Sequence, residues 1–283
     1  MMAAGSTEVV ATLRAAGCVF AEDEARLLTA AATETGADLD TLVAQRVSGT
    51  PLEYLLGWAE FNGLRVAVAP GVFVPRQRTA FLVAEAAGLA RARDRHSVVV
   101  DLCCGTGALG LALATILAAE HTPVTLAAAD IDPVAVDCAR RNLTPLGAPV
   151  YQGDLFDPLP AELRGCIDIL LANTPYVPSE MIARMPPEAR DHEPRTALDG
   201  GPDGLDIFRR VVEGAESWLA PGGHLLVESS EAQAPVAVAV LAEHGLIGRI
   251  AESDEHHATV VIGTRPTRSL NYFLRPVNSS IER

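Results

Sequence analysis

Aromatic residues are scarce in this sequence, and it has no long apolar run. Aromatics make up 5% of the 283 residues and hydrophobic residues 49%, so aliphatic side chains dominate the prospective core. That mixture is typical of helices packed on a parallel sheet. The apolar stretches end well short of the roughly 18 residues that read as a membrane-spanning helix, which argues against a membrane protein.

Basic charge is also in short supply. The chain has 22 lysines and arginines against 36 aspartates and glutamates, a net charge of −14. Such a surface repels phosphate backbones, so the charge disfavours non-specific binding of nucleic acid. The same charge also favours solubility, and a local basic patch remains compatible with it.

Cysteines are few, and none stands at metal-ligand spacing. Their odd number indicates reduced thiols, and their spacing predicts no metal site. The N-terminus lacks a basic region followed by an apolar run, so we expect no signal peptide. A cytoplasmic protein accounts for both features. The five cysteines are Cys18, Cys103, Cys104, Cys138 and Cys166.

The first 78 residues predict two small units. Apolar residues recur at helical spacing in residues 1–57, with Ser6 as a candidate N-cap, which predicts a small helical domain. Residues 58–78 then alternate in polarity around the turn dipeptide Asn62-Gly63, which predicts a β-hairpin linker that runs on to residues 73–76.

Residues 79–266 alternate between strand and helix patterns. This order predicts an α/β fold, a doubly wound parallel sheet with right-handed crossovers, whose ligands bind at the carboxyl ends of the strands. Residues 267–283 form a short tail. The expected strands are 98–102, 124–129, 167–172 and 224–227, with a late pair near 246–251 and 258–263, and the expected helices are 79–93, 108–119, 133–142 and 206–219.

A glycine-containing loop follows the first of these strands and opens a helix. Glycines let a backbone approach a ligand closely and aim its amides at it. Alone, such a loop also fits a tight structural turn. The vicinal cysteines within it are expected to act as small apolar residues. The loop residues are Cys103, Cys104, Gly105, Thr106 and Gly107.

Two acidic residues at later strand ends identify the ligand class. Asp130 ends the next strand, where its carboxylate can accept both hydroxyls of a ribose. Asp154, followed by Leu155, ends the third strand region, where it can accept an adenine amino group. The loop lacks the third glycine of the pyrophosphate-binding pattern. S-adenosylmethionine therefore fits better than NAD, and the pattern favours a methyltransferase over a dehydrogenase or a bare structural fold.

A tetrapeptide directly after the fourth strand suits a planar NH2 acceptor. An amide nitrogen is a poor nucleophile, so it must be held in line with the methyl–sulfur bond. The Asn173 side-chain oxygen and the Thr174 carbonyl can grip its two N–H groups, while Pro175 fixes the turn and Tyr176 can stack on the planar group. The same residues also fit a plain turn with a packed tyrosine.

With these motifs in place, the chain resembles the HemK/PrmC family of protein-(glutamine-N5) methyltransferases over residues 45–265. Residues 51–57 and 60–64 resemble the family's linker and hairpin. The block at 193–201, followed by Asp203-Gly204-Leu205, is especially specific. The sequence 220–223 resembles the turn before the fifth strand. The resemblance implies a Rossmann-like class I methyltransferase sheet behind a small N-terminal helical domain that helps to recognise the protein partner.

The resemblance also implies roles for individual residues. The substrate would be a glutamine of a protein, release-factor-like, whose target motif in this family is Gly-Gly-Gln. The cofactor-binding positions are Cys103, Cys104, Gly105, Thr106, Gly107, Asp130, Asp154, Leu155 and Asn173. The glutamine-binding and catalytic positions are Asn173, Thr174, Pro175 and Tyr176.

Three departures from the family pattern affect the substrate more than the chemistry. The usual Asn-Pro-Pro-Tyr has Thr174 in second place, which keeps the backbone carbonyl but loses some rigidity. The usual Pro-Arg-Pro-Glu-Thr-Glu is replaced by the sequence at 75–80, and Cys103-Cys104 stands where Gly-Thr is usual.

Two other functions compete with this one. A nucleic-acid adenine N6-methyltransferase shares the acceptor motif and would stack a flipped base on Tyr176. The charge of −14 and the lack of an evident basic recognition domain weigh against it. A non-catalytic binding module is the third reading, and the full set of cofactor residues speaks against it.

Overall fold

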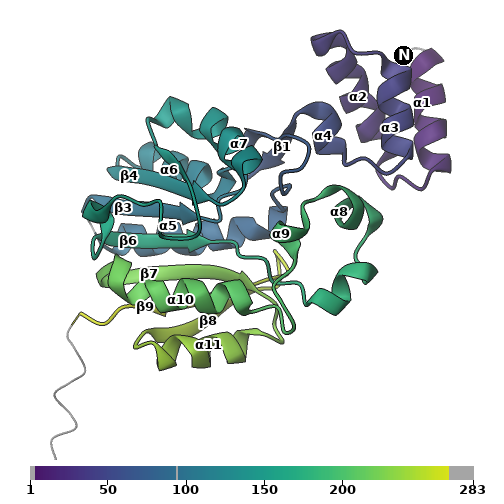
Figure 1. Cartoon of the computed structure of the whole chain (residues 1–283). Coiled ribbons are helices and arrows are strands. Elements are labelled where there is room, and N and C mark those ends of the chain that lie inside the picture. The colour runs from purple at the N-terminus through teal and green to yellow at the C-terminus, as the bar shows by residue number, and fades with distance from the viewer. Residues whose placement is uncertain (1–3, 94, 268–283) are drawn as a thin grey trace, which may run out of the picture.

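The computed structural model describes residues 4–93 and 95–267. Helices at the N-terminus lead through a hairpin into a seven-stranded sheet with helices on both faces (Figure 1). Most of the predicted tail, residues 268–283, lies outside the described residues. No helix in the described part is long and apolar enough to cross a membrane.

The N-terminal helices pack around their own apolar core. This core contains Leu13, Leu28 and Val43, all buried. Ser6 lies inside the first helix, so its prediction as an N-cap is wrong, whereas Asp38 caps α3 by accepting the Thr41 N–H at 2.9 Å. The helices are α1 (Ala4–Ala15), α2 (Ala21–Thr35), α3 (Leu39–Val47) and α4 (Leu52–Leu56).

The hairpin is shorter than the alternation predicted. Strands β1 (Trp58–Phe61) and β2 (Leu64–Ala67) pair antiparallel, and the turn between them has positive φ at both of its residues, as a type I′ turn requires. Strand structure stops at Ala67, so the predicted extension to residues 73–76 is wrong. Pro70 and Pro75 lack the N–H that a ladder needs, and a 3₁₀ turn, η1 (Gln77–Thr79), follows.

The large sheet has the strand order β5-β4-β3-β6-β7-β9-β8. Its first five strands are parallel, but β9 pairs antiparallel with β7 and β8 antiparallel with β9. The sheet is therefore mixed and not wholly parallel, because a short turn joins β8 to β9 and such a turn permits only antiparallel pairing. The strands are β3 (Ser97–Leu102), β4 (Val124–Asp130), β5 (Val150–Gln152), β6 (Ile167–Ala172), β7 (Leu219–Ser229), β8 (Ile247–Ser253) and β9 (Ala258–Thr264).

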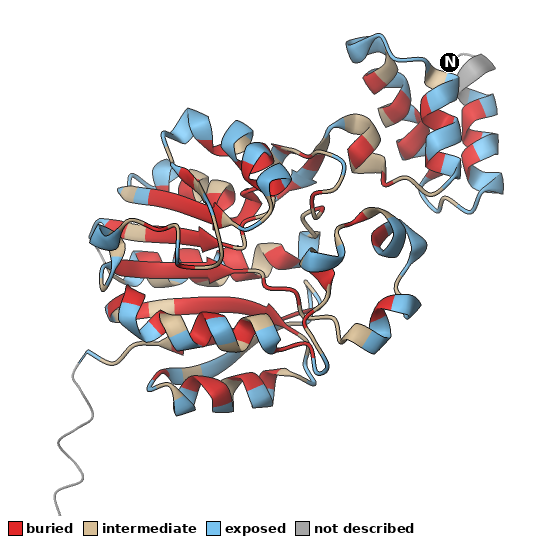
Figure 2. Cartoon of the chain, viewed as in Figure 1, coloured by how far each residue is buried: buried red, intermediate tan, exposed pale blue. Residues whose placement is uncertain are grey.

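Two apolar clusters cover the two faces of this sheet. Successive residues of β3 point to opposite faces: Val99 joins the cluster beneath α5, α6 and α7, and Val100 joins the one beneath α10 and α11. The central strands are buried on both sides (Figure 2). The covering helices are α5 (Ala80–Ala92), α6 (Ala108–Ala119), α7 (Pro133–Leu143), α10 (Asp206–Trp218) and α11 (Ala234–Glu243).

Residues 178–199, between β6 and α10, form an excursion that we call the cover segment. It leaves the carboxyl end of the sheet and approaches the N-terminal helices (Figure 1). It consists of η4 (Ser179–Arg184), α8 (Pro187–His192) and α9 (Arg195–Leu198). Two further 3₁₀ turns, η2 (Thr144–Leu146) and η3 (Ala161–Leu163), connect strands and helices elsewhere.

Candidate active site

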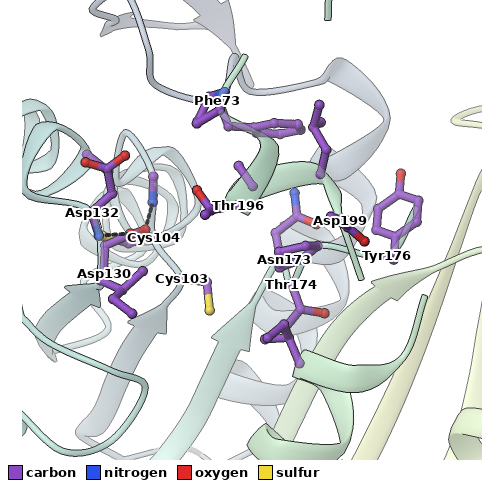
Figure 3. A pocket seen from close by; sticks show the side chains of 18 of the residues that line it. Phe73, Cys103, Cys104, Asp130, Asp132, Asn173, Thr174, Tyr176, Thr196 and Asp199 are labelled. Carbon is purple, nitrogen blue, oxygen red and sulfur yellow. Dashed lines mark hydrogen bonds between the residues drawn. The ribbon is translucent and has the colours of Figure 1, made fainter. Parts of the chain in front are cut away.

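A cavity of about 680 Å³ opens at the carboxyl ends of β3, β4 and β6. Its volume falls within the range of about 300–1,000 Å³ found for small-molecule sites. Figure 3 shows Asp130 and Cys104 on one side of it and Asn173 and Tyr176 on the other. Every predicted site residue lines this cavity except Gly107.

Gly107 serves the packing of the loop instead. A Cβ at this position would lie 3.0 Å from the Cδ1 atom of Leu143 in α7, and the backbone has φ of 75°. Both features favour glycine, because the position is left-handed and closely packed. Gly107 therefore lets α6 begin tightly against α7 and leaves ligand contacts to the rest of the loop.

Asp130 is held in place by the loop itself. Its Oδ2 atom accepts the Gly105 N–H at 2.8 Å, and its Oδ1 atom accepts the Asp132 N–H at 3.0 Å. Burial raises the pKa of Asp130, although these backbone donors act in the opposite direction. Each carboxylate oxygen keeps a further lone pair, so the group can still accept hydroxyls from a ligand.

The hairpin braces the same loop through Asn142 of α7. The Asn142 Nδ2 donates to the Thr106 carbonyl at 2.8 Å and to the Ala67 carbonyl at 3.0 Å. Its Oδ1 atom accepts the Ala67 N–H at 2.8 Å. One side chain thus ties the hairpin to the cofactor loop.

Asp154 is paired with an arginine that the sequence did not indicate. Arg210 of α10 donates to its Oδ2 atom at 2.7 Å, and both side chains are about half exposed on the cavity wall. Leu155 follows with a left-handed φ of 48°. That Asp154 accepts an adenine amino group stays a prediction. A bound adenine would share the Asp154 carboxylate with Arg210.

Asn173 lies directly beyond β6 and faces the cavity (Figure 3). Within residues 4–93 and 95–267, no group is hydrogen-bonded to its side-chain amide. A polar side chain at a cavity wall without a protein partner is available to a ligand. Thr174 and Pro175 behind it are buried, which fixes the backbone of residues 173–176, the segment that we call the acceptor loop.

The glycines of the 193–205 block let its backbone pack directly against the acceptor loop. A Cβ on Gly200 would lie 2.6 Å from the Pro175 carbonyl oxygen, and one on Gly204 would lie 2.2 Å from that of Tyr176. The Gly200 N–H also donates to the Val177 carbonyl at 2.9 Å. Only glycine lets this backbone approach so closely.

Tyr176 is held by its hydroxyl group. It donates to the Glu228 Oε1 atom at 3.1 Å and accepts from the guanidinium of Arg78. Burial, reinforced by the charge of Glu228, raises the pKa of Tyr176 to about 12. The phenol therefore stays neutral at physiological pH, and its stacking on an acceptor amide stays a prediction.

Some cavity residues were not predicted as site residues, among them Phe73, Arg76 and Thr196. Phe73 and Thr196 lie across the cavity from the strand ends (Figure 3). Glu193 accepts the Val74 N–H at 3.2 Å and pairs with Arg76 at 2.6 Å, while the Arg76 guanidinium lies 5.0 Å from the centre of the Phe73 ring. The motif pieces at 75–76 and 193–194 are visible in the sequence, but their contact joins positions 117 residues apart.

In the described ranges, no group of three or more histidine, cysteine, aspartate or glutamate side chains could hold a metal ion. The five cysteines are all free thiols.

This fold and site define a Rossmann-like methyltransferase. A family model described as a methyltransferase domain matches residues 93–272. Two solved structures share the fold: a methyltransferase from Pyrococcus furiosus and the Thermus thermophilus 16S rRNA N2 G1207 methyltransferase in complex with AdoMet and guanosine. The first has a TM-score of 0.51 at 15% identity and covers 72% of this chain and 90% of its own. The second has a TM-score of 0.50 at 20% identity and covers 74% of this chain and 49% of its own.

Proteins of similar sequence identify the family of methyltransferases to which the chain belongs. The release factor glutamine methyltransferase of Geobacter sulfurreducens is 37% identical over 226 residues, which cover 79% of this chain and 76% of the relative. The enzyme of the same name from Mycolicibacterium smegmatis is 37% identical over 266 residues, which cover 84% of this chain and 92% of the relative. The chain belongs to the release factor glutamine methyltransferase family.

Proposed function

We propose that this protein transfers a methyl group from S-adenosylmethionine to the side-chain amide nitrogen of a glutamine in a peptide chain release factor. The observation that carries the proposal is the side-chain amide of Asn173, which faces the cavity beside the cofactor loop and has no hydrogen-bond partner among the described residues. The names of the relatives agree with this substrate.

The residues present fit the cofactor. The Asp130 carboxylate, fixed by two backbone donors at the end of β4, suits a pair of ribose hydroxyls. The loop residues Cys103 to Thr106 supply the close backbone approach, and Leu155 adds an apolar wall. When bound there, S-adenosylmethionine supplies an electrophilic methyl group.

Orientation is the main task of the acceptor loop. The Asn173 side-chain oxygen and the Thr174 carbonyl can each accept one N–H of the incoming amide, which turns the weakly nucleophilic nitrogen towards the methyl group. Phe73 lies on the opposite side of the cavity against the guanidinium of Arg76, which pairs with Glu193, and its ring would help to keep water from the reacting groups. Such positioning raises the rate without a protein group that must first take a proton, because the nitrogen becomes acidic as it gains the methyl group and releases its proton during or after the transfer. The products would be the N-methylated amide, S-adenosylhomocysteine and the released proton.

We assign recognition of the protein partner to the N-terminal part of the chain. Residues 1–57 would bind the release factor, and residues 58–78 would link them to the methyltransferase domain at residues 79–266. Residues 267–283 would form a C-terminal tail. The ion pair between Arg46 and Glu188 supports this division, because it places the N-terminal helices beside the cover segment at the cavity. The free thiols support a location in the cytoplasm.

A single-turnover assay tests the function. Labelled S-adenosylmethionine, a purified bacterial release factor and the wild-type protein should yield one methylated glutamine, identified by mass spectrometry. Asn173→Ala should slow transfer about 100-fold, since loss of one positioned polar contact at a reacting centre has this order of effect. Asn62→Gly, at the exposed hairpin turn, is the matched control and should retain the wild-type rate.

Two results would contradict the proposal. A wild-type rate for Asn173→Ala would exclude the grip on the amide. Methylated adenine in added nucleic acid, with no label in the release factor, would assign the protein to the rival class.

A further inference from the structure

A second cavity of about 430 Å³ adjoins the active-site cavity at Tyr176. It is formed where β7 ends and β9 begins, at the same edge of the sheet as the active site. Arg78 and Tyr176 line both cavities and so form the wall between them.

That wall is anchored on a buried carboxylate. The Oε1 atom of Glu228 accepts from Arg78 Nε at 2.9 Å and from the Tyr176 hydroxyl at 3.1 Å. The Glu228 side chain is 4% exposed, and its Oε2 atom has no hydrogen-bond partner in the described part of the chain. A buried carboxylate oxygen without a partner is costly, so Glu228 leaves an unsatisfied negative group in the wall of the second cavity.

The lining includes the imidazole of His257 and the methyl groups of Ala232 and Ala258 beside its polar groups, and its carboxylates outnumber its guanidinium groups. Glu228 and Glu231 outweigh Arg78, and Glu231 forms no ion pair with any described residue. Ser229, Ser230 and Thr259 add hydroxyl groups. This chemistry selects a cationic side chain that also donates hydrogen bonds, such as lysine or arginine.

The second cavity is also tied to the acceptor loop. Gln233 donates through its Nε2 atom to the Tyr176 carbonyl at 2.9 Å and to the Asp203 carbonyl at 2.9 Å. Its Oε1 atom accepts from the Ser230 hydroxyl at 2.8 Å. The loop after β7 is thereby fixed against the residues that would hold the acceptor amide.

We propose that the second cavity is a subsite for the side chain of a residue next to the target glutamine, with a preference for a basic residue there. The inference rests on the proposed function and deepens it. When a glutamine side chain enters the active-site cavity and reaches Asn173, the Cα atoms of the next residues in the release factor lie about 3.8 Å apart along the chain. The side chain of such a neighbour can reach the second cavity beyond Tyr176.

A charge exchange tests the preference. Release-factor variants with Ala, Lys or Glu at each position flanking the glutamine are titrated against the protein with S-adenosylhomocysteine, and their KM values are measured in the methylation assay. At one of the two positions, Lys should be favoured over Glu by about fivefold in both affinity and KM, the order of effect of an exposed ion pair. Glu231→Arg should reverse the order.

A filling substitution tests the space itself. Ala232 is exposed on the cavity lining and its side chain makes no hydrogen bond, so Ala232→Trp should raise the KM for the release factor about tenfold and abolish the flanking preference. Ala242 is exposed on α11 and lines neither cavity, so the control Ala242→Trp should leave KM unchanged. Calorimetry should show unaltered S-adenosylhomocysteine affinity for both variants.

The two proposals fail in different ways. The subsite would be overturned, and the function left intact, if glutamine is methylated but the preference between Lys and Glu beside it is the same in wild type, Glu231→Arg and Ala232→Trp. A flanking preference in binding that Glu231→Arg reverses, without any methylation, would support the subsite and overturn the function.

Discussion

Arg46 of α3 pairs with Glu188 of α8 at 2.6 Å, which links the N-terminal helices to the cover segment. The same guanidinium bonds Glu24 of α2 through its Nε atom at 2.6 Å and lies 9% exposed. One buried arginine thus connects two N-terminal helices with the segment that lines the active-site cavity. Movement of the N-terminal helices would act on the cavity through this contact.

Replacement of Arg46 by methionine should destabilise the protein strongly. The substitution keeps the apolar stem but leaves Glu24, whose side chain is 10% exposed, without its partner. Breaking a buried pair from one side costs about 3–5 kcal/mol. Thermal unfolding followed by circular dichroism should show the loss, whereas Arg26→Met, which removes an exposed pair with Asp23, should cost under about 1 kcal/mol. Equal melting curves for the two variants would contradict the account.

Removal of the Asp130 charge should weaken the cofactor without unfolding the loop. Asp130→Asn keeps one acceptor for the backbone donors but lacks the charge that strengthens bonds to ribose hydroxyls. Since hydrogen bonds to charged groups contribute about 1.5–3 kcal/mol, calorimetry with S-adenosylhomocysteine should show an affinity loss of roughly 10- to 100-fold. Asp157→Asn, exposed and outside the cavity lining, is the control. Unchanged affinity for Asp130→Asn would exclude the ribose assignment.

The sequence predicted those parts of the fold that local pattern determines. The bounds of β6 and α6 match the prediction residue for residue, because β6 ends directly before the polar Asn173 and α6 begins directly after Gly107. Asp130 and Asn173 lie at the ends of β4 and β6, the two strands that flank β3, and their meeting at one edge of the sheet follows from the predicted parallel arrangement. These features need no knowledge of remote contacts.

The remaining parts depend on contacts between distant segments. No local signal links Glu193 to Val74, or Arg210 to Asp154. The first contact holds the backbone beside the cavity residue Phe73, and the second lies on the cavity wall itself. Gly107 looked like a ligand contact because its neighbours are, yet its constraint comes from Leu143 in another helix. Sequence patterns name the residue types of a site but leave open which neighbour each side chain meets.

Cys103 should resist replacement by a β-branched residue. Its backbone has φ of 55°, a left-handed conformation that costs a non-glycine residue about 1–2 kcal/mol and is worst for β-branched side chains. Cys103→Gly should therefore leave the stability of the cofactor-free protein within about 1 kcal/mol, while Cys103→Val should lower it by about 2 kcal/mol or more. Cys166→Val, at an exposed position with ordinary φ, controls for the side chain. Indistinguishable denaturant midpoints for the two valine variants would show that the loop adapts freely.

Asp101 should make the stability of the protein depend on pH. It lies buried beneath the cofactor loop and accepts the Gly110 N–H at 2.8 Å, and burial raises its pKa to about 7. The unfolded value is about 4, so the folded chain binds more protons than the unfolded chain between these two values. The contribution of this group to folding is therefore complete below about pH 4 and is lost as the pH rises towards 7.

Asp101→Asn isolates that contribution, because the new carboxamide oxygen can still accept the Gly110 N–H and carries no charge at any pH. The variant and the wild type should be of similar stability near pH 4, and the variant should become the more stable by up to roughly 4 kcal/mol at pH 8. Urea unfolding across this range measures the difference. Two curves that stay parallel from pH 4 to pH 8 would mean that Asp101 keeps its ordinary ionisation in the folded chain, and that the donors around the loop outweigh its burial.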